Sequence, residues 1–355
     1  MKIEYIFALF AVIGGLDHIF GNKLKLGEEF EKGIMTTGVL VLSMTGTMVL
    51  APVLAEGISF LLTPVFNYLH IDISAIGSFF AVDSGGAVMS YQLSDDVLLR
   101  GYHGMVIASM FGATICPVIP LSLQMIDKKH NSDVFVGYLC GFATMPVGCI
   151  VAGLIIGIPF LQLLLNTLPI ILLSVLICIG LLKAPELTKK IFGVFGAILT
   201  VLMIGGLVIG ILHKLTGIEA IKGIAPIDES FVIIGNIAIL LAGVFPLLAI
   251  VSKVFKPLFK KLANLLKIND TSVLGLITTL ANSVPVFSML NDMDRKGRIL
   301  NIAFVVSAGF LLGDHLAFAL AYDNTFVLPM VLGKFISGLT ALVFTNLIYG
   351  KIIKE

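Results

Sequence analysis

The chain has 355 residues, of which 58% are hydrophobic and 13% are charged, with a formal net charge of +1. Soluble domains carry about 25% charged residues, so a soluble enzyme, a disordered chain and a secreted disulfide scaffold are all excluded as classes. A nucleic-acid binder is excluded as well, because it would present a concentrated basic surface. The composition therefore predicts an all-α, polytopic membrane protein.

Nine apolar stretches are long enough to cross a bilayer, which takes about 20 residues. In chain order they are 3–21, 33–55, 103–125, 134–158, 160–182, 191–213, 231–252, 299–322 and 325–350. Two shorter apolar stretches, 75–91 and 272–290, contain helix breakers, at Ser84-Gly85-Gly86 and at Asn282-Ser283-Val284-Pro285. Each follows a segment that we expect to lie at the membrane interface, 57–71 and 254–267.

The distribution of lysine and arginine predicts that the two shorter stretches are re-entrant hairpins. If neither crosses, eighteen of the 23 basic residues lie on one side of the membrane. The other side holds only Lys2, Arg100, Lys214 and Lys222, and Lys334 falls inside a span. Basic residues collect on the cytoplasmic side, so we expect the N-terminus outside and the C-terminus in the cytoplasm.

The chain reads as a single transmembrane transporter domain, 1–355, with an internal repeat. The repeats cover about 33–158 and 231–350 and are linked by the spans within 160–213. Residues 52–55 resemble 246–249, and the pairs Arg100 and Arg298, and Ser109 and Ser307, are both 198 residues apart. The charge assignment starts the first repeat inside and the second outside, so the repeats are inverted. Inverted repeats with broken helices are typical of secondary transporters, whose sites lie near the midplane.

Polar residues at the hairpin tips are candidate binding residues, because charge at membrane depth is costly unless paired. Asp83, beside Ser84 and Gly85, lies at the first tip, where it could bind a ligand or cap the tip's own amides. Asn282 and Ser283 lie at the corresponding second tip, where they could bind a hydroxyl group or cap the broken helix.

Asp314 and His315 lie deep in the predicted span 299–322. They could relay protons or bind a cation, or Asp314 could pair with Lys334 in the next span. Lys334 needs a carboxylate at that depth, and Asp314 and Asp83 are the candidates. His103, at the outer end of its span, is expected to be solvated.

Motifs of the common hydrolases and ATPases are absent from the sequence, which has no P-loop, HExxH or GxSxG. We therefore expect no enzymatic activity, no cofactor and no metal, with coupling to Na⁺ or H⁺ left open. The cysteines, Cys116, Cys140, Cys149 and Cys178, have no CxxC spacing and are expected to be buried thiols.

Six sequence blocks, in order, resemble the ethanolamine-utilisation membrane protein family, or ethanolamine permeases. The blocks are 30–35, 50–55, Asp83-Ser84-Gly85-Gly86, 146–149, 280–285 and 312–316, and the resemblance runs through nearly the whole chain. It implies a multi-pass protein of the bacterial inner membrane that admits ethanolamine for catabolism by a cytosolic ammonia-lyase and its microcompartment. The expected partners are ethanolamine and membrane lipids, with a homo-oligomer left open and no nucleic acid.

The candidate residues suit a small ammonium ion with one hydroxyl. Asp83, favoured over Asp314, would supply the counter-charge, and Asn282 or Ser283 would contact the hydroxyl. One alternative is an Na⁺- or H⁺-coupled symporter of another small solute; the lack of an arginine at membrane depth disfavours a carboxylate substrate. The other alternative is a membrane scaffold or sensor that docks a partner on the basic face.

Overall fold

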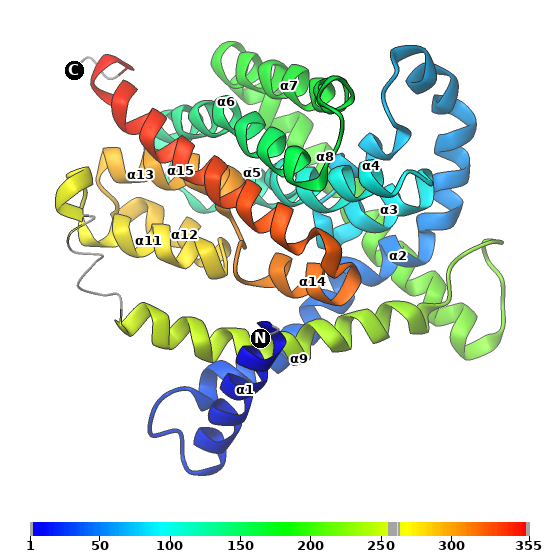
Figure 1. Ribbon diagram of the computed structural model, residues 1–355, viewed down its shortest axis with the longest axis horizontal. Coiled ribbons are helices and arrows are strands. Elements are labelled where there is room, and N and C mark those ends of the chain that lie inside the picture. The colour runs from blue at the N-terminus through cyan, green and yellow to red at the C-terminus, as the bar shows by residue number, and fades with distance from the viewer. Residues whose placement is uncertain (1–2, 255–260, 262, 353–355) are drawn as a thin grey trace.

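All regular elements of the structure are helices. The computed structural model describes residues 3–254, 261 and 263–352 (Figure 1), and within these residues no strand occurs. This agrees with the all-α membrane protein that the composition predicts. The predicted interfacial segment 254–267 lies partly outside the described residues, and Lys2, Lys256, Lys260 and Lys354 of the charge distribution lie outside them.

The helices follow one another with short connections. The first part of the chain forms α1 (Ile3–Ile19), α2 (Gly27–Leu69), η1 (Ile73–Phe79), η2 (Val82–Gly86), α3 (Ala87–Leu93), α4 (Val97–Gly101), η3 (Tyr102–Gly112), η4 (Thr114–Val118) and α5 (Ile119–Met125). The middle part forms η5 (Lys128–His130), α6 (Asn131–Ile156), α7 (Phe160–Lys183), α8 (Pro185–Thr216) and α9 (Ile227–Val254). The last part forms α11 (Asp270–Ala281), α12 (Val284–Met289), η6 (Leu290–Asp292), α13 (Arg295–Ala308), α14 (Asp314–Tyr322), η7 (Asn324–Phe326) and α15 (Val327–Ile352).

Seven helical stretches of the described residues are long and apolar enough to cross a membrane, judged by length and composition. They are Gly27–Leu69, Val97–Met125, Lys128–Ile156, Phe160–Lys183, Pro185–Thr216, Ile227–Val254 and Asn324–Gly350. These stretches coincide with seven of the nine predicted spans. The first predicted span, 3–21, forms a helix of only 17 residues, α1.

The predicted continuous span 299–322 is wrong. Helix α13 ends at Ala308, and α14 begins at Asp314, so five residues in between leave the helix. Hydropathy did not reveal this break, because Phe310, Leu311 and Leu312 keep the segment apolar.

The predicted boundary between a span at 33–55 and an interfacial helix at 57–71 is also wrong. Helix α2 continues through both, with Pro52 and Pro64 inside it. A proline in a helix interior removes one backbone hydrogen bond and kinks the helix, but the helix can continue beyond it. Figure 1 shows α2 changing direction between its part beside α9 and its part at the right-hand edge.

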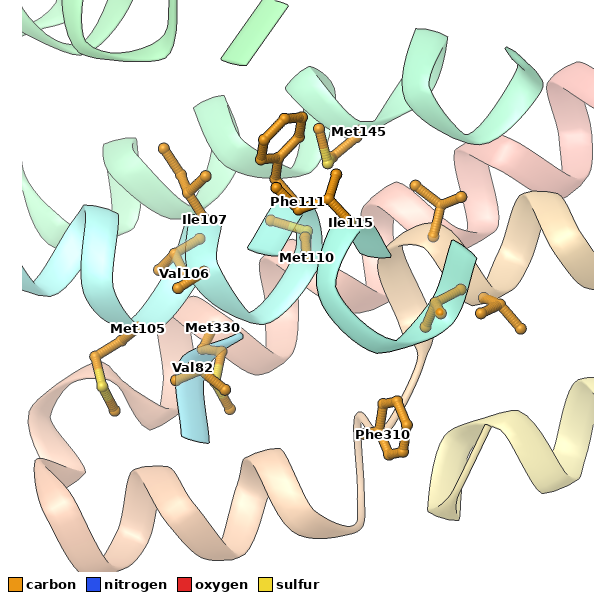
Figure 2. Packing of buried hydrophobic residues seen from close by; sticks show 14 of the residues in the cluster. Val82, Met105, Val106, Ile107, Met110, Phe111, Ile115, Met145, Phe310 and Met330 are labelled. Atoms are coloured by element: carbon orange, nitrogen blue, oxygen red, sulfur yellow. The ribbon is translucent and has the colours of Figure 1, made fainter. Parts of the chain in front are cut away.

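The core of the molecule is built around the stretch Val97–Met125, the most buried of the seven. All eleven residues of η3 are buried. Figure 2 shows Phe111 close to Met145 of α6, and Val82 of η2 close to Met330 of α15, and all four belong to one apolar cluster. The first interrupted segment is therefore packed into the protein interior.

Helices α7 and α8 are the least covered of the seven, with 28% and 22% of their most apolar windows buried. Leu176 of α7 and Val201 of α8 are among their exposed apolar side chains. In a bilayer such side chains contact lipid. Helix α8 is held against α2 by a close crossing, where a Cβ atom on Gly206 would lie 2.2 Å from the carbonyl oxygen of Gly46.

Both interrupted segments return to the place where they begin. After α3, the Ser94 hydroxyl donates to a carboxylate oxygen of Asp72, before η1, at 2.9 Å. After α12, the carbonyl of Asp292 accepts from the side-chain amide of Asn269, before α11, at 3.0 Å. A membrane crossing would separate the two ends by about 30 Å. Each segment therefore turns back on itself.

Candidate binding site at the helix breaks

The first break lies between η1 and α3 and carries Asp83, Ser84 and Gly85. Gly85 has a φ of +120°, a conformation that glycine adopts far more readily than other residues. A Cβ atom at Gly85 would lie 3.1 Å from Cβ of Thr47 in α2, so the glycine lets the turn pack directly on that helix. Asp83 is half-buried here, and the Ser84 hydroxyl donates to its Oδ1 at 3.3 Å.

The second break lies between α11 and α12, at Asn282 and Ser283. Asn282 is extended, and its Oδ1 accepts the backbone N–H of Val284 at 2.9 Å, which caps α12. The Ser283 hydroxyl is buried and has no hydrogen-bond partner among the described residues. It lies 2.8 Å from the place of a Cβ atom on Gly309. The second break therefore touches the third, between α13 and α14.

The third break crosses the end of α11 with its backbone extended. The N–H groups of Phe310 and Leu312 donate to the carbonyls of Thr279 and Leu280 at 3.0 and 2.7 Å. Phe310 has a φ of +59°, which is uncommon for a residue other than glycine. These contacts satisfy backbone groups that would otherwise be unpaired inside a membrane. Helix α14 then starts at Asp314, within the protein.

Lys334 of α15 is buried, with 1% of its surface exposed. Its ammonium donates to the carbonyl of Ser109 in η3 and lies 3.1 Å from Nδ1 of His315. Among the described residues, no carboxylate oxygen lies within 4.0 Å of its Nζ. The predicted ion pair of Lys334 with Asp314 is therefore not formed. Successive helical residues point about 100° apart, and it is His315, one residue on, that faces Lys334.

The two acids lie near each other across the first and third breaks. η2 packs against α14, and the charge of Asp83 acts on Asp314. Asp83 is also the carboxylate whose charge acts on Lys334. Asp314 Oδ1 is buried and has no hydrogen-bond donor among the described residues. Such an arrangement of acids can bind a small cation by charge-assisted hydrogen bonds.

The predicted site residues fall into two groups. The group at the first break and beyond contains Asp83, Ser84, Gly85, Asp314, His315 and Lys334. Asn282 and Ser283 form the other group, which contacts the third break through Gly309. No hydrogen bond among the described residues joins the two groups directly.

A cavity of about 460 Å³ lies beside the first break. Ser84 lines it together with Ser43 of α2, Gln124 of α5 and Thr200 of α8, and the rest of its lining is mostly apolar. Pockets of about 300–1,000 Å³ accommodate small organic molecules. The cavity thus gives Ser84, and the acid beside it, an approach from outside the core.

The expectation of a solvated His103 is wrong. Its side chain is fully buried, and its ring nitrogens lie 3.2 Å from the Ser78 hydroxyl and 3.1 Å from Oδ1 of Asn166. His103 therefore connects the first hairpin to α7. Its partners are 25 and 63 residues away in sequence, so no local pattern could indicate them.

Two features of the site were missed by the sequence reasoning. The Ser109 contact is made by a backbone carbonyl, for which sequence carries no signal. The third break has a signal, the glycine pair Gly309 and Gly313 around Phe310, but the apolar residues between them conceal it.

Comparisons with known proteins give one consistent result. The family described as "Ethanolamine utilisation protein, EutH" matches residues 2–348. A protein of Listeria monocytogenes named "Probable ethanolamine permease EutH" is 40% identical over 340 residues, covering 96% of this chain and 91% of that protein.

Other relatives agree over the same length. A Salmonella typhimurium protein, also named "Probable ethanolamine permease EutH", is 34% identical over 379 residues, covering 96% of this chain and 93% of that protein. A Bacillus subtilis protein named "Uncharacterized protein YxeR" is 33% identical over 340 residues, covering 96% of this chain and 92% of its own length. No solved structure matches the chain.

Proposed function

The chain belongs to the EutH family of ethanolamine utilisation proteins, and from that membership we propose that it is a membrane transporter that imports ethanolamine. Two of the relatives carry the name of a probable ethanolamine permease. The seven apolar stretches fit a multi-pass membrane protein. The observation that carries the proposal is the pair of neighbouring acids, Asp83 and Asp314, one of which has a buried oxygen with no donor among the described residues.

Ethanolamine binds as its ammonium ion, between Asp83 and Asp314. An ammonium that leaves water needs a counter-charge and acceptors for its three N–H groups. Asp83 is the principal contact, because the neighbouring Ser84 lines the cavity through which a solute can approach. Asp314 Oδ1 supplies a second acceptor. The turn at Gly85, directly beside Asp83, lets the backbone approach the ligand.

The substrate hydroxyl binds toward the second break. Ser283 has a buried hydroxyl with no partner among the described residues. Asn282 uses its Oδ1 to cap α12, which leaves its NH₂ group as a donor. Replacing Asn282 with alanine is therefore expected to weaken ethanolamine more than ethylamine, which lacks the hydroxyl. Equal weakening of both amines would exclude Asn282 from the hydroxyl contact.

The two halves of the chain form inverted repeats, about 33–158 and 231–350, joined by the spans within 160–213. A constant offset of 198 residues supports this: Asp96 caps α4, and Asp294 caps α13. The contact of Ser94 with Asp72 has its counterpart in the contact of Asp292 with Asn269. Helices α6 and α15, at corresponding places in the two halves, have 26 residues each.

The two hairpins are re-entrant from opposite sides of a bacterial inner membrane, and the C-terminus is cytoplasmic. Polar contacts that join segments assigned to the same face support this. On the cytoplasmic side, Asn291 donates to the carbonyl of Met125 at 3.3 Å and accepts the N–H of Asp127 at 3.0 Å. On the outer side, the Tyr91 hydroxyl donates to Asp323 at 2.7 Å.

Cysteine accessibility tests the first hairpin. In a variant whose native cysteines are replaced by alanine, His70→Cys and Asp95→Cys place thiols at exposed positions on its two flanks. We expect an impermeant maleimide to label both from outside the cell. Labelling from opposite sides would mean that the segment crosses the membrane and would refute the re-entrant topology.

Transport itself is tested by counterflow of labelled ethanolamine in proteoliposomes, with and without Na⁺ and pH gradients. Asp83→Asn keeps the size of the side chain and removes its charge, so it should abolish counterflow at unchanged protein levels. Asp95→Asn makes the same chemical change at an exposed position and should leave counterflow intact. Saturable, normal counterflow by Asp83→Asn would move the ammonium site elsewhere, and strict dependence on an Na⁺ gradient would favour an ion-coupled symporter.

A further inference from the structure

The buried cluster at the first and third breaks carries a defined charge. It contains two acids, Asp83 and Asp314, and one basic side chain, Lys334. His315 accepts a hydrogen bond from the Lys334 ammonium through Nδ1, which assigns its proton to Nε2 and leaves the ring neutral. With both acids ionised, the cluster therefore has one net negative charge.

No other charged group among the described residues packed around Asp314 alters this balance. Helix α14 packs against α9, η2, α15 and η7. Residues 230–252 of α9 contain no titratable side chain, and η7 contains none. The remaining titratable neighbours are thiols: Cys149 of α6 beside Lys334, and Cys116 of η4 beside Asp83.

One unbalanced charge at membrane depth is expensive. A bound ethanolammonium ion cancels it, and when the ammonium is absent a proton on one carboxyl cancels it equally well. Two neighbouring carboxyl groups accommodate one proton between them more easily than two negative charges. We propose that the pair Asp83 and Asp314 exchanges one proton for one ammonium ion, so that the site is neutral both when loaded and when empty.

Asp314 is the acid that carries the proton. Asp83 accepts a hydrogen bond from Ser84, and the charge of Lys334 stabilises its ionised form. Asp314 has neither advantage, because its Oδ1 meets no donor in the described part of the chain and Lys334 contacts His315 instead. When the ammonium binds, the O–H bond of Asp314 breaks and the proton passes to water on the side from which the substrate came.

The consequence rests on the proposed function and makes transport electroneutral. In each cycle one ethanolammonium enters and one proton leaves, so the membrane potential does no work on the exchange. A carrier that moved the ammonium alone would accumulate it about 50-fold at about −100 mV. The exchanger instead accumulates it in proportion to the ratio of internal to external proton concentration.

Proton release on binding tests the exchange directly. Purified protein in weakly buffered detergent at neutral pH is mixed with ethanolamine adjusted to the same pH, and an indicator dye reports released protons. We expect one proton per bound ammonium from the wild type and from the control Asp95→Asn. Asp314→Asn should release none, with binding retained but weakened. Binding without proton release by the wild type would overturn the proposal.

A second measurement needs no variant. Proteoliposomes clamped with a K⁺ gradient and valinomycin should show the same protein-dependent accumulation with and without a potential, after subtraction of protein-free vesicles. Accumulation of about 50-fold driven by about −100 mV would overturn the exchange. Failure of the proposed function would look different, because the wild type would then show no counterflow of ethanolamine at all.

Discussion

Replacing Lys334 by methionine tests whether charge holds the buried cluster together. Methionine keeps most of the apolar stem and removes the ammonium. The Ser109 carbonyl and His315 Nδ1 then lose their donor, and Asp83 loses the cation that acts on it. An unpartnered buried acceptor costs about 1–3 kcal/mol, and a buried charge that loses its partner costs about 3–5 kcal/mol. Because both effects occur together here, we expect a loss of stability of about 3–5 kcal/mol.

A double-mutant cycle then identifies the acid that Lys334 compensates. Asp83→Asn in the Lys334→Met background removes the carboxylate that was left without its cation. It should recover about 0.5–3 kcal/mol, the range of coupling energies between interacting residues. Asp314→Asn should recover less, because its charge is not among those that act on Lys334.

Thermal unfolding in detergent, followed with a thiol-reactive fluorophore, measures these differences. Cys140 and Cys149 are free and buried, so they react when the protein unfolds. The reasoning is refuted if Lys334→Met melts at the same temperature as both double variants. It is also refuted if Asp314→Asn restores more stability than Asp83→Asn does.

Two further substitutions test the first break and the cytoplasmic face. Gly85→Ala forces a Cβ atom into a backbone conformation with φ of +120°, so a loss of about 1–3 kcal/mol and weaker counterflow are expected. Gly205→Ala has open space around it and should change neither, so equal melting temperatures would contradict this account. Arg298→Met removes a buried donor 3.1 Å from Asp133 and should cost about 1–3 kcal/mol, because Arg295 still reaches that carboxylate. Arg298→Lys should restore part of the loss by recovering the charge, and an unchanged melting temperature for Arg298→Met would show that the ion pair is dispensable.

The long helices could be predicted because hydropathy is a local property. Runs such as 160–182 and 191–213 are apolar over their full length, and the helices Phe160–Lys183 and Pro185–Thr216 follow them closely. The first two breaks could be predicted for the same reason. Gly85 at one and Pro285 at the other are residues whose backbone preferences interrupt a helix without help from the rest of the fold.

The third break could not be predicted because distant residues stabilise it. Its backbone N–H groups are satisfied by the carbonyls of Thr279 and Leu280, about thirty positions earlier in the chain. Read locally, Phe310 and Leu312 belong to an apolar stretch with no proline, which favours a continuous helix. Only the path of α11 beside them makes the extended conformation possible.

The same limitation applies to Lys334, and its consequence is chemical. Burial of a lysine predicts that a compensating group is nearby, and an acid is the usual choice. The structure instead gives the ammonium two uncharged acceptors, Ser109 and His315, and leaves its charge to act on Asp83 without direct contact. An acid that is stabilised without being occupied can still accept the hydrogen bonds of another ammonium. Had Lys334 paired directly with Asp314 or Asp83, a substrate cation would have to displace it. The arrangement with neutral acceptors therefore combines a permanent buried cation with carboxylates that remain free to bind.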